Sequence, residues 1–190
     1  CYDRLAGRDT AREVISRPAS RAEAGAPQAT LLETSWEFER NASAFRIRPY
    51  KPVYFLPIFH TDRVNQTPHS PSLGNVSHPL ILDNDEAKFQ ISFKSKLVND
   101  LMGDNGDVWA GYTQSSRWQI YNKQDSRPFR ETNYEPELMF VWRTNQALPA
   151  LPGMRARYLS LGVNHQSNGR SGPLSRSWNR VIGSIGLESE

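Results

Sequence analysis

Five consecutive segments alternate apolar and polar residues with a period of two, the spacing that puts successive side chains on opposite faces of a β-strand. They cover residues 89–97, 108–120, 134–142, 159–163 and 181–187. Most of these stretches extend to about 10 residues, longer than the mean strand of about 5–6 and typical of the roughly 9–11 residues in a tilted strand that spans a membrane. The alternation predicts an all-β fold of antiparallel strands, either a transmembrane β-barrel or a soluble antiparallel barrel or sandwich.

Composition narrows the alternatives in two ways. The mean hydropathy is −0.65, and the longest apolar runs, at 53–59 and 138–142, fall far short of the roughly 18–20 residues that a spanning helix needs. A helical membrane protein is therefore excluded, whereas a β-barrel is not, because only alternate residues of its strands face lipid. The net charge of +3 is too small to indicate a nucleic-acid partner.

The rest of the chain suggests two regions. Residues 1–45 are hydrophilic, and we expect them to form an N-terminal extension or linker that is partly disordered, with a short helix or irregular cap within 31–45. Residues 46–190 contain the five alternating segments preceded by an extended, Pro-interrupted stretch at 48–60, which makes six candidate strands. Residues 62–84 have little pattern and predict a long loop.

The ends of the chain predict a fragment. No signal peptide is recognisable, and Cys1 is the only cysteine, so it has no partner within the sequence. The chain either is a processed mature form or begins partway through a longer one, and its last residues follow directly on a candidate strand. An open sheet of six strands would leave two unpaired edges, which lipid does not tolerate. We therefore expect further strands outside this sequence.

The segment 164–180, NHQSNGRSGPLSRSWNR, is the most informative for function. His165 and Ser167 are two residues apart on a candidate strand, so both point to the same face at a rise of roughly 6.6 Å. An imidazole at that spacing can act as general base for a serine hydroxyl. Asn179 has the same odd parity on the next candidate strand, and all three residues are in phase with the apolar positions. Polar groups on an apolar face are costly, which favours a function for them.

Simpler interpretations of these residues exist. A Ser and a His two residues apart occur by chance in many proteins, and Asn179 could cap a strand end. Arg170 and Arg176 could be solvated loop charges. The chemistry itself is unusual, because an Asn cannot stabilise an imidazolium by charge; it can, however, bond the second ring nitrogen and fix the tautomer. An Asn also avoids an unpaired carboxylate beside hydrocarbon.

The pattern NH-x-SNGRS-x-P-x-SRSWNR resembles the active-site block of the outer-membrane phospholipase A family, whose members are transmembrane β-barrels that hydrolyse the acyl esters of phospholipids. Three further blocks agree in order: RPYKPVYFLP at 48–57, GYTQSSRWQIYN at 111–122 and RPFRETNYEPEL at 127–138. The resemblance extends over roughly residues 45–187. No GxSxG elbow of other serine hydrolases is present.

The resemblance implies a role for each matching residue. Ser167 matches the nucleophile, His165 the general base and Asn179 the residue that orients the histidine. Gly169 matches a backbone N–H donor of the oxyanion hole, and Gln114 matches a polar residue near the active site. The family requires calcium, and the matching ligands are given by the carbonyl of Arg170, the hydroxyl of Ser175 and, from the partner chain of a homodimer, Ser126. Oxygen ligands fit a hard cation that is bound weakly.

The resemblance also explains the parity of these residues. In this family the triad lies on the outside of a barrel of about twelve strands, in the outer membrane of Gram-negative bacteria, where a phospholipid can approach laterally. We therefore expect this chain to hold the first half of such a barrel, to dimerise and to act as a calcium-dependent phospholipase of the A1/A2 and lysophospholipase type. The alternatives are a non-catalytic outer-membrane barrel or pore fragment, and a soluble periplasmic β-domain that binds a ligand.

Overall fold

The computed structural model describes residues 29–39, 43–125 and 127–189. Its helical elements are the α-helix α1 (Leu31–Trp36) and the 3₁₀-helix η1 (Gly172–Leu174). The strands are β1 (Ile47–Pro49), β2 (Tyr54–His60), β3 (His69–Ser70), β4 (Gly74–Asn75), β5 (Asp85–Val98), β6 (Asp107–Trp118), β7 (Phe129–Ala147), β8 (Met154–Ser167) and β9 (Ser177–Ser189). Within these residues, no helix is both long enough and apolar enough to cross a membrane.

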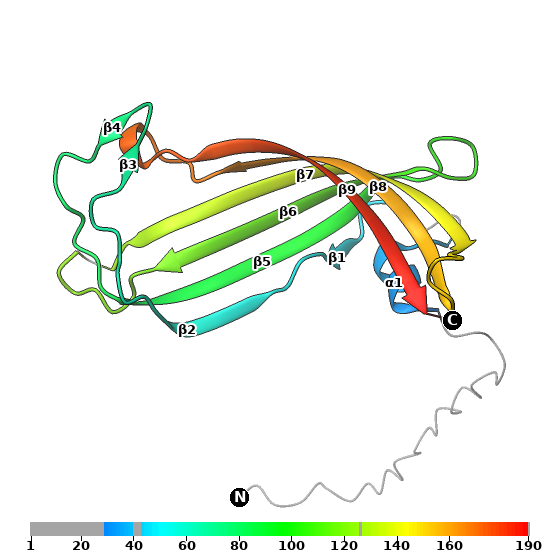
Figure 1. Ribbon diagram of the computed structural model, residues 1–190, viewed down its shortest axis with the longest axis horizontal. Coiled ribbons are helices and arrows are strands. Elements are labelled where there is room, and N and C mark those ends of the chain that lie inside the picture. The colour runs from blue at the N-terminus through cyan, green and yellow to red at the C-terminus, as the bar shows by residue number, and fades with distance from the viewer. Residues whose placement is uncertain (1–28, 40–42, 126, 190) are drawn as a thin grey trace, which may run out of the picture.

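One antiparallel, curved sheet dominates the structure (Figure 1). Its order is β1-β5-β6-β7-β8-β9, and β2 also pairs with β5, so that β1 and β2 share one edge of the sheet. The five alternating segments are strands β5 to β9, as predicted, and the extended stretch at 48–60 forms β2 and the end of β1, which are interrupted at residues 50–53. The predicted loop at 62–84 contains one element that the sequence did not indicate, the hairpin β3–β4.

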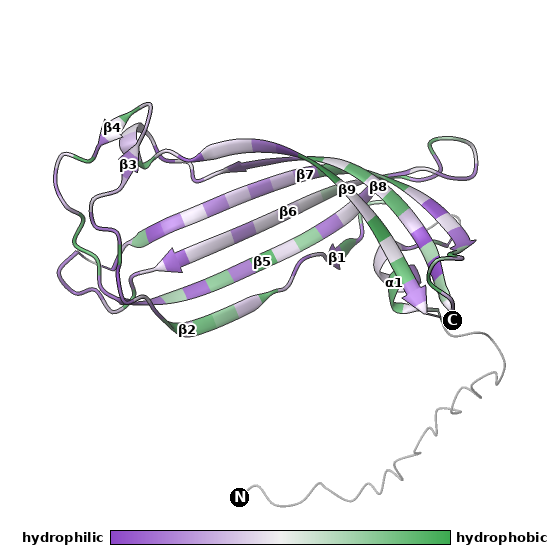
Figure 2. Cartoon of the chain, in the orientation of Figure 1, coloured by the Kyte–Doolittle hydropathy of each residue, from purple (hydrophilic) through white to green (hydrophobic). Residues whose placement is uncertain are grey.

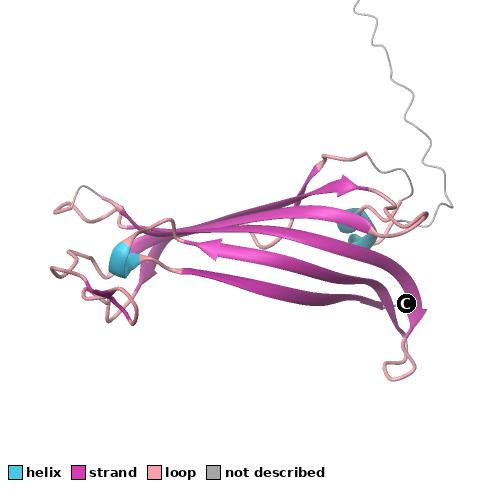
Figure 3. Cartoon of the chain, turned by 90° about the horizontal axis from the view of Figure 1, so that it is seen from above, coloured by secondary structure: helices cyan, strands magenta, loops and turns pink. Residues whose placement is uncertain are grey.

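The connections gather at the two ends of the sheet (Figure 3). One end holds the longer segments: residues 61–84, the described residues 119–125 and 127–128 between β6 and β7, and the β8–β9 connection, residues 168–176, which contains η1. The other end holds the shorter connections, residues 99–106 and 148–153, together with α1 (Figures 1 and 3). The β8–β9 connection is thus separated from α1 by the length of the strands.

The two faces of the sheet differ in polarity, as the alternating colours along β5, β8 and β9 show (Figure 2). The face that we call inner buries charged side chains, among them Lys96 and Asp107, which form an ion pair of 3.0 Å and are fully shielded from solvent. The outer face exposes aliphatic side chains: Leu161 is 61% exposed and Val181 is 74% exposed. A soluble sheet protein buries its apolar side chains and exposes its charges, whereas this arrangement is typical of a transmembrane strand.

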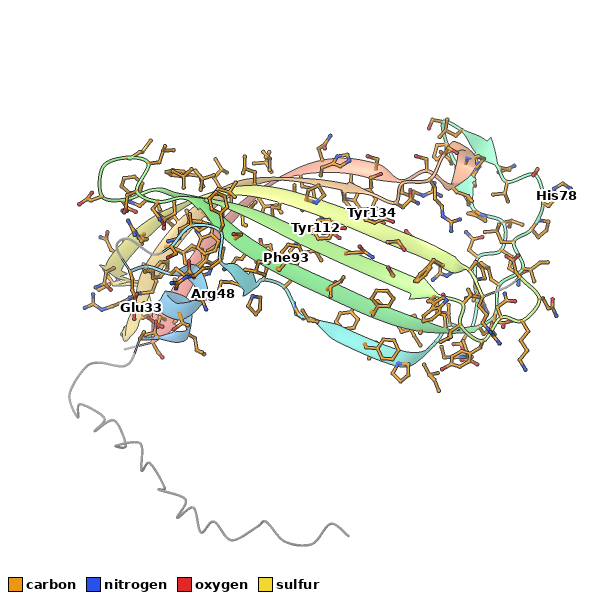
Figure 4. The ribbon with its side chains drawn as sticks, turned by 180° about the vertical axis from the view of Figure 1, so that it is seen from behind. Glu33, Arg48, His78, Phe93, Tyr112 and Tyr134 are labelled. Atoms are coloured by element: carbon orange, nitrogen blue, oxygen red, sulfur yellow. The ribbon has the colours of Figure 1, made fainter. Side chains whose placement is uncertain are left out.

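Helix α1 lies against the inner face. A capping box starts it, in which the Thr30 hydroxyl accepts from the Glu33 N–H and the Glu33 carboxylate accepts from the Thr30 N–H. This bond, together with the nearby Arg157 guanidinium, holds the pKa of the Glu33 carboxyl below its usual value. Trp36 packs edge-on against Trp109 of β6, with ring centroids 5.5 Å apart. An ion pair fixes the segment after α1, in which the Glu37 carboxylate accepts from the Arg48 guanidinium at 2.7 Å. Glu33 and Arg48 lie near each other at this end of the molecule (Figure 4).

The division of the chain at residue 45 stays a prediction. Residues 1–28, including Cys1, lie outside the described residues. Of the remainder of the predicted extension, α1 and the adjoining Glu37 and Phe38 contact the sheet, and Trp36 is buried. These contacts tie the end of the extension to the inner face of β5, β6 and β8.

Candidate active site

His165 and Asn179 lie directly opposite each other on β8 and β9. Their side chains meet on the outer face, where His165 Nδ1 is 2.8 Å from Asn179 Oδ1. Because an amide oxygen can only accept, Nδ1 carries the proton and donates it to Asn179. The second ring nitrogen, Nε2, then holds its lone pair free to accept a proton. The arrangement produces the tautomer that a general base requires.

Ser167 follows His165 on the same face of β8 and is the last residue of that strand. Its hydroxyl oxygen accepts a hydrogen bond of 3.2 Å from the backbone N–H of Gly169. Gly169 has a φ of +63°, a left-handed conformation that favours glycine because it has no Cβ. In this conformation the Gly169 N–H points to the Ser167 hydroxyl. An oxyanion site requires a main-chain donor next to the nucleophile in this way.

The connection 168–176, which we call the active-site loop, is organised by Asn168. This side chain is 7% exposed; its Nδ2 donates to the Leu174 carbonyl at 2.8 Å, and its Oδ1 accepts from the N–H groups of Arg170 and Arg176. Its main-chain N–H donates to the Arg176 carbonyl at 3.0 Å. One buried amide therefore closes the loop across η1. We did not single out Asn168 from the sequence, although an Asn before Gly is a signal for such a turn.

The three predicted calcium ligands fall in different places. Arg170 and Ser175 lie in the active-site loop on either side of η1, and Ser126 lies outside the described residues. The Arg170 guanidinium donates to the Phe129 carbonyl at 2.7 Å. Among the described residues, neither the Arg170 carbonyl nor the Ser175 hydroxyl has a hydrogen-bond partner, so two oxygens remain available. No group of three or more His, Cys, Asp or Glu side chains gathers into a metal site in the described ranges.

Gln114 belongs to the same transverse row of the sheet as Ser167. Gln114 on β6 faces Tyr134 on β7, and Tyr134 faces Ser167 on β8. With strands about 4.8 Å apart, the backbones of Gln114 and Ser167 are about 10 Å from each other. The Gln114 side-chain carbonyl accepts from the Tyr112 hydroxyl at 3.1 Å. Tyr112 and Tyr134, with Phe93, form an aromatic patch on β5 to β7 (Figure 4).

A groove of about 580 Å³ passes His165 and Asn179. Leu138, Val163 and Val181 contribute apolar walls, and all three are more than 45% exposed. The polar pair therefore lies in an apolar setting.

Comparison with known proteins identifies the family. A family model described as phospholipase A1 matches residues 32–190. The chain belongs to the phospholipase A1 family. Among similar members, phospholipase A1 of Klebsiella pneumoniae is 39% identical over 72% of this chain and 45% of that protein. Phospholipase A1 of Escherichia coli strain K12 is 36% identical over 90% of this chain and 54% of that protein. This phospholipase A1 family chain thus spans about half the length of the curated relatives that it matches.

Solved structures of the family agree with the fold. The calcium-bound dimer of the outer membrane phospholipase from Salmonella typhi has a TM-score of 0.66 at 34% identity, over 86% of this chain and 60% of that chain. The outer membrane phospholipase A from Escherichia coli gives 0.64 at 37% identity, over 77% and 57%. An active-site mutant of the Escherichia coli protein, with an asparagine replaced by alanine, gives 0.65 at 35% identity, over 80% and 56%.

These comparisons confirm the predicted family and the predicted class of antiparallel β-barrel fold. The strands form an open sheet in the described residues, and barrel closure is not seen. The structure pairs His165 with Asn179 and Ser167 with Gly169, with His165 and Ser167 two residues apart on one face of β8, and it places Arg170 and Ser175 in the adjoining loop. The roles of these residues, and of Gln114 and Ser126, stay predictions.

Proposed function

We propose that this chain is the catalytic part of a calcium-dependent outer-membrane phospholipase that hydrolyses acyl ester bonds of phospholipids. One observation carries the proposal: His165 and Asn179 form a hydrogen-bonded pair of 2.8 Å on the exposed apolar face, with Ser167 beside them. A soluble ligand-binding domain is disfavoured, because the inner face buries Lys96 and Asp107 while the outer face exposes aliphatic side chains.

The reaction follows from the positions of the side chains. Ser167 Oγ attacks the acyl carbonyl carbon while His165 Nε2 takes the hydroxyl proton, and Asn179 holds Nδ1–H in place. The Gly169 N–H, which donates to Ser167 Oγ at rest, then donates to the carbonyl oxygen as it becomes negative. The C–O bond to the glycerol oxygen breaks, and His165 returns the proton to that leaving oxygen. His165 then deprotonates a water that attacks the acyl carbon, the bond from that carbon to Ser167 Oγ breaks, and His165 returns the proton to Oγ as the fatty acid leaves.

The neutral Asn179 suits the setting. A carboxylate in its place would lie beside Val181 and Val163 on the lipid-facing surface, where an unpaired charge is costly. An amide oxygen still orients the imidazole at a smaller cost of desolvation. The Escherichia coli relative, in which an active-site mutant has an asparagine replaced by alanine, supports an asparagine at the active site.

The residues of the active-site loop fit a calcium ion. The carbonyl of Arg170 and the hydroxyl of Ser175 are hard, uncharged oxygen donors, which calcium accepts, and Ser126 of a second copy would complete the set. When bound, calcium would supply positive charge beside the developing oxyanion. The relative from Salmonella typhi, a dimer with bound calcium, supports both the ion and the homodimer.

The orientation in the membrane follows from the loops. Outer-membrane barrels have short turns on the periplasmic side and longer loops outside. Residues 61–84, the described residues 119–125 and 127–128, and the active-site loop lie at one end, and the shorter connections lie at the other with α1. The triad therefore faces the outer leaflet, and the N-terminal segment is periplasmic. The solved relatives are named as outer membrane proteins, in agreement with this location.

The test is phospholipid hydrolysis by the full protein in detergent micelles with calcium. Ser167→Ala should abolish hydrolysis while the change in electrophoretic mobility on heating, which reports barrel folding, stays as in the parent. Ser177→Ala is the matched control, because Ser177 lies opposite Ser167 in the same row. Hydrolysis that persists in Ser167→Ala would contradict the proposal.

A further inference from the structure

The inner face directly behind the triad carries a hydrogen-bonded cluster that the proposed chemistry does not use. Asn164 and Arg180 are the sequence neighbours of His165 and Asn179, and they too lie opposite each other across β8 and β9. Because side chains alternate along a strand, these two point inward where His165 and Asn179 point outward. On each of the two strands, the cluster is thus one residue away from the His165–Asn179 pair.

Arg180 binds two successive inward residues of β8. Its Nε and Nη2 donate to Asn164 Oδ1 at 3.2 and 2.8 Å, and Nη2 also donates to Gln166 Oε1 at 2.8 Å. The planar guanidinium presents its donors in a fixed geometry, so the two acceptors set the position of Arg180 along β8. The hydrogen bonds of Arg180 therefore depend on the register of the two strands.

The cluster continues to β7. Asn164 is 2% exposed, and its Nδ2 donates to Glu137 Oε2 at 3.2 Å. Glu137 in turn accepts from the Tyr50 hydroxyl at 2.7 Å. Arg180 also forms an ion pair of 3.3 Å with Glu135. Strand β7 is next to the proposed nucleophile, because its Tyr134 lies opposite Ser167. The cluster therefore links β7, β8 and β9, the three strands around the triad.

The outer face supplies little to fix this alignment. A slip of one residue between β8 and β9 would reverse the faces and is strongly opposed, but a slip of two residues keeps apolar side chains outward. The neighbouring pair on this face, Val163 and Val181, is apolar. It therefore does not distinguish the observed register from one that is slipped by two residues. After such a slip His165 would face Ser177 or Val181 in place of Asn179. Outside the active-site loop, which Asn168 closes, the inner face therefore distinguishes the two registers.

We propose that Arg180 is a positioning residue for the triad: by binding Asn164 and Gln166 together, it fixes the β8–β9 register that places Asn179 opposite His165. This inference rests on the proposed function, since it assigns Asn179 the task of orienting the imidazole. Arg180 touches neither the imidazole nor the hydroxyl of Ser167, and acts through strand alignment alone.

A kinetic double-mutant cycle tests the inference in the full protein. Arg180→Met should lower kcat about 10- to 100-fold and leave KM within about twofold, because the base is misplaced while the apolar groove is intact. In an Asn179→Ala background the same substitution should lower kcat by less than about twofold further, since its effect passes through Asn179. Arg180→Lys keeps the charge but can make only part of these hydrogen bonds, so its kcat should lie between those of Arg180→Met and the parent.

The control is Arg157→Met. Arg157 also lies on β8 and joins it to β9, through Glu188 at 3.4 Å, but at the opposite end of the strands. It should lower the unfolding temperature without changing kcat. If Arg180→Met does not fold, Arg180→Lys takes its place in the cycle. An unchanged kcat in Arg180→Met would overturn the inference. So would a double variant in which kcat falls by the product of the two single effects.

A second readout is independent of catalysis. Val163→Cys and Val181→Cys, introduced together with Cys1→Ser, place two thiols at facing outer positions. Their disulfide should form in high yield with Arg180 present and in clearly lower yield in Arg180→Met, because slipped pairings separate the thiols. Equal yields would overturn the register claim, whatever the outcome for Ser167→Ala. Loss of the proposed function alone would instead leave the difference in yield intact.

Discussion

His165 and Asn179 face each other across β8 and β9 with Nδ1 and Oδ1 2.8 Å apart. Because Oδ1 can only accept, this contact fixes the proton on Nδ1 and leaves Nε2 available for the Ser167 hydroxyl. The contact also lies on the apolar face, where an uncharged partner is less costly than a carboxylate.

Asn179→Ala should lower kcat by about 10- to 100-fold, less than the roughly 10⁴-fold effect of replacing the aspartate of a charged triad, because no charge is lost. Asn179→Asp restores an acceptor for Nδ1 and should retain more activity than the alanine variant. Initial rates of ester hydrolysis at saturating substrate provide the measurement. Equal activity in all three proteins would show that Asn179 does not orient the base.

Gly169→Ala should impair catalysis more than stability. Gly169 has φ +63°, and an added Cβ would meet Tyr134 at 3.4 Å. Gly172, in the same loop, has φ +60° and open space around it. Either alanine should cost about 1–2 kcal/mol of backbone strain. Only Gly169→Ala displaces the N–H beside Ser167, so it alone should lower kcat by about tenfold or more. Equal losses of kcat would contradict an oxyanion role for Gly169.

Removal of calcium with a chelator should abolish hydrolysis, and added calcium should restore it. Ser175→Ala should raise the calcium concentration needed for half-maximal activity, because one oxygen ligand is lost. Ser171→Ala is the control from the same loop and should leave that concentration unchanged. An identical calcium dependence for Ser175→Ala and the parent would remove Ser175 from the ligand set.

Trp36 should contribute to the stability of the folded protein. Its ring is buried against Trp109 and Tyr158, whereas Leu31 on the same helix is 88% exposed. Trp36→Ala should lower the free energy of unfolding by about 3–5 kcal/mol, and Leu31→Ala by less than about 0.5 kcal/mol. Denaturant unfolding of the refolded protein measures both. Similar effects of the two substitutions would indicate that α1 does not dock on the sheet in solution.

Much of the architecture could be predicted from the alternation of residues. Parity places His165 and Ser167 on one face of their strand, and the apolar series of each strand places Asn179 on the same side, because a strand leaves only two choices for each side chain. The two apolar series, at 159–163 and 181–187, then identify that face as the one in contact with lipid or core. Which of these two surroundings applies follows only from the burial of charges such as Lys96 on the opposite side.

Contacts between distant segments could not be predicted in this way. Tyr50 donates to Glu137, 87 residues away, and Lys96 donates to the Glu37 carbonyl, 59 residues away. Neither bond has a local signature, since each depends on the curvature that brings β1 and α1 against the inner face. The same holds for Arg180, whose spacing in the sequence resembles that of any solvated charge.

The most direct test of the account is covalent labelling of the nucleophile. An alkyl fluorophosphonate, which forms a stable bond with an activated serine, should label the full protein at Ser167 alone, as mass spectrometry of its peptides would show. His165→Ala should suppress the labelling, because the hydroxyl then lacks its base. Labelling at another serine, or undiminished labelling of Ser167 in His165→Ala, would contradict the assignment of Ser167 and His165 as nucleophile and base.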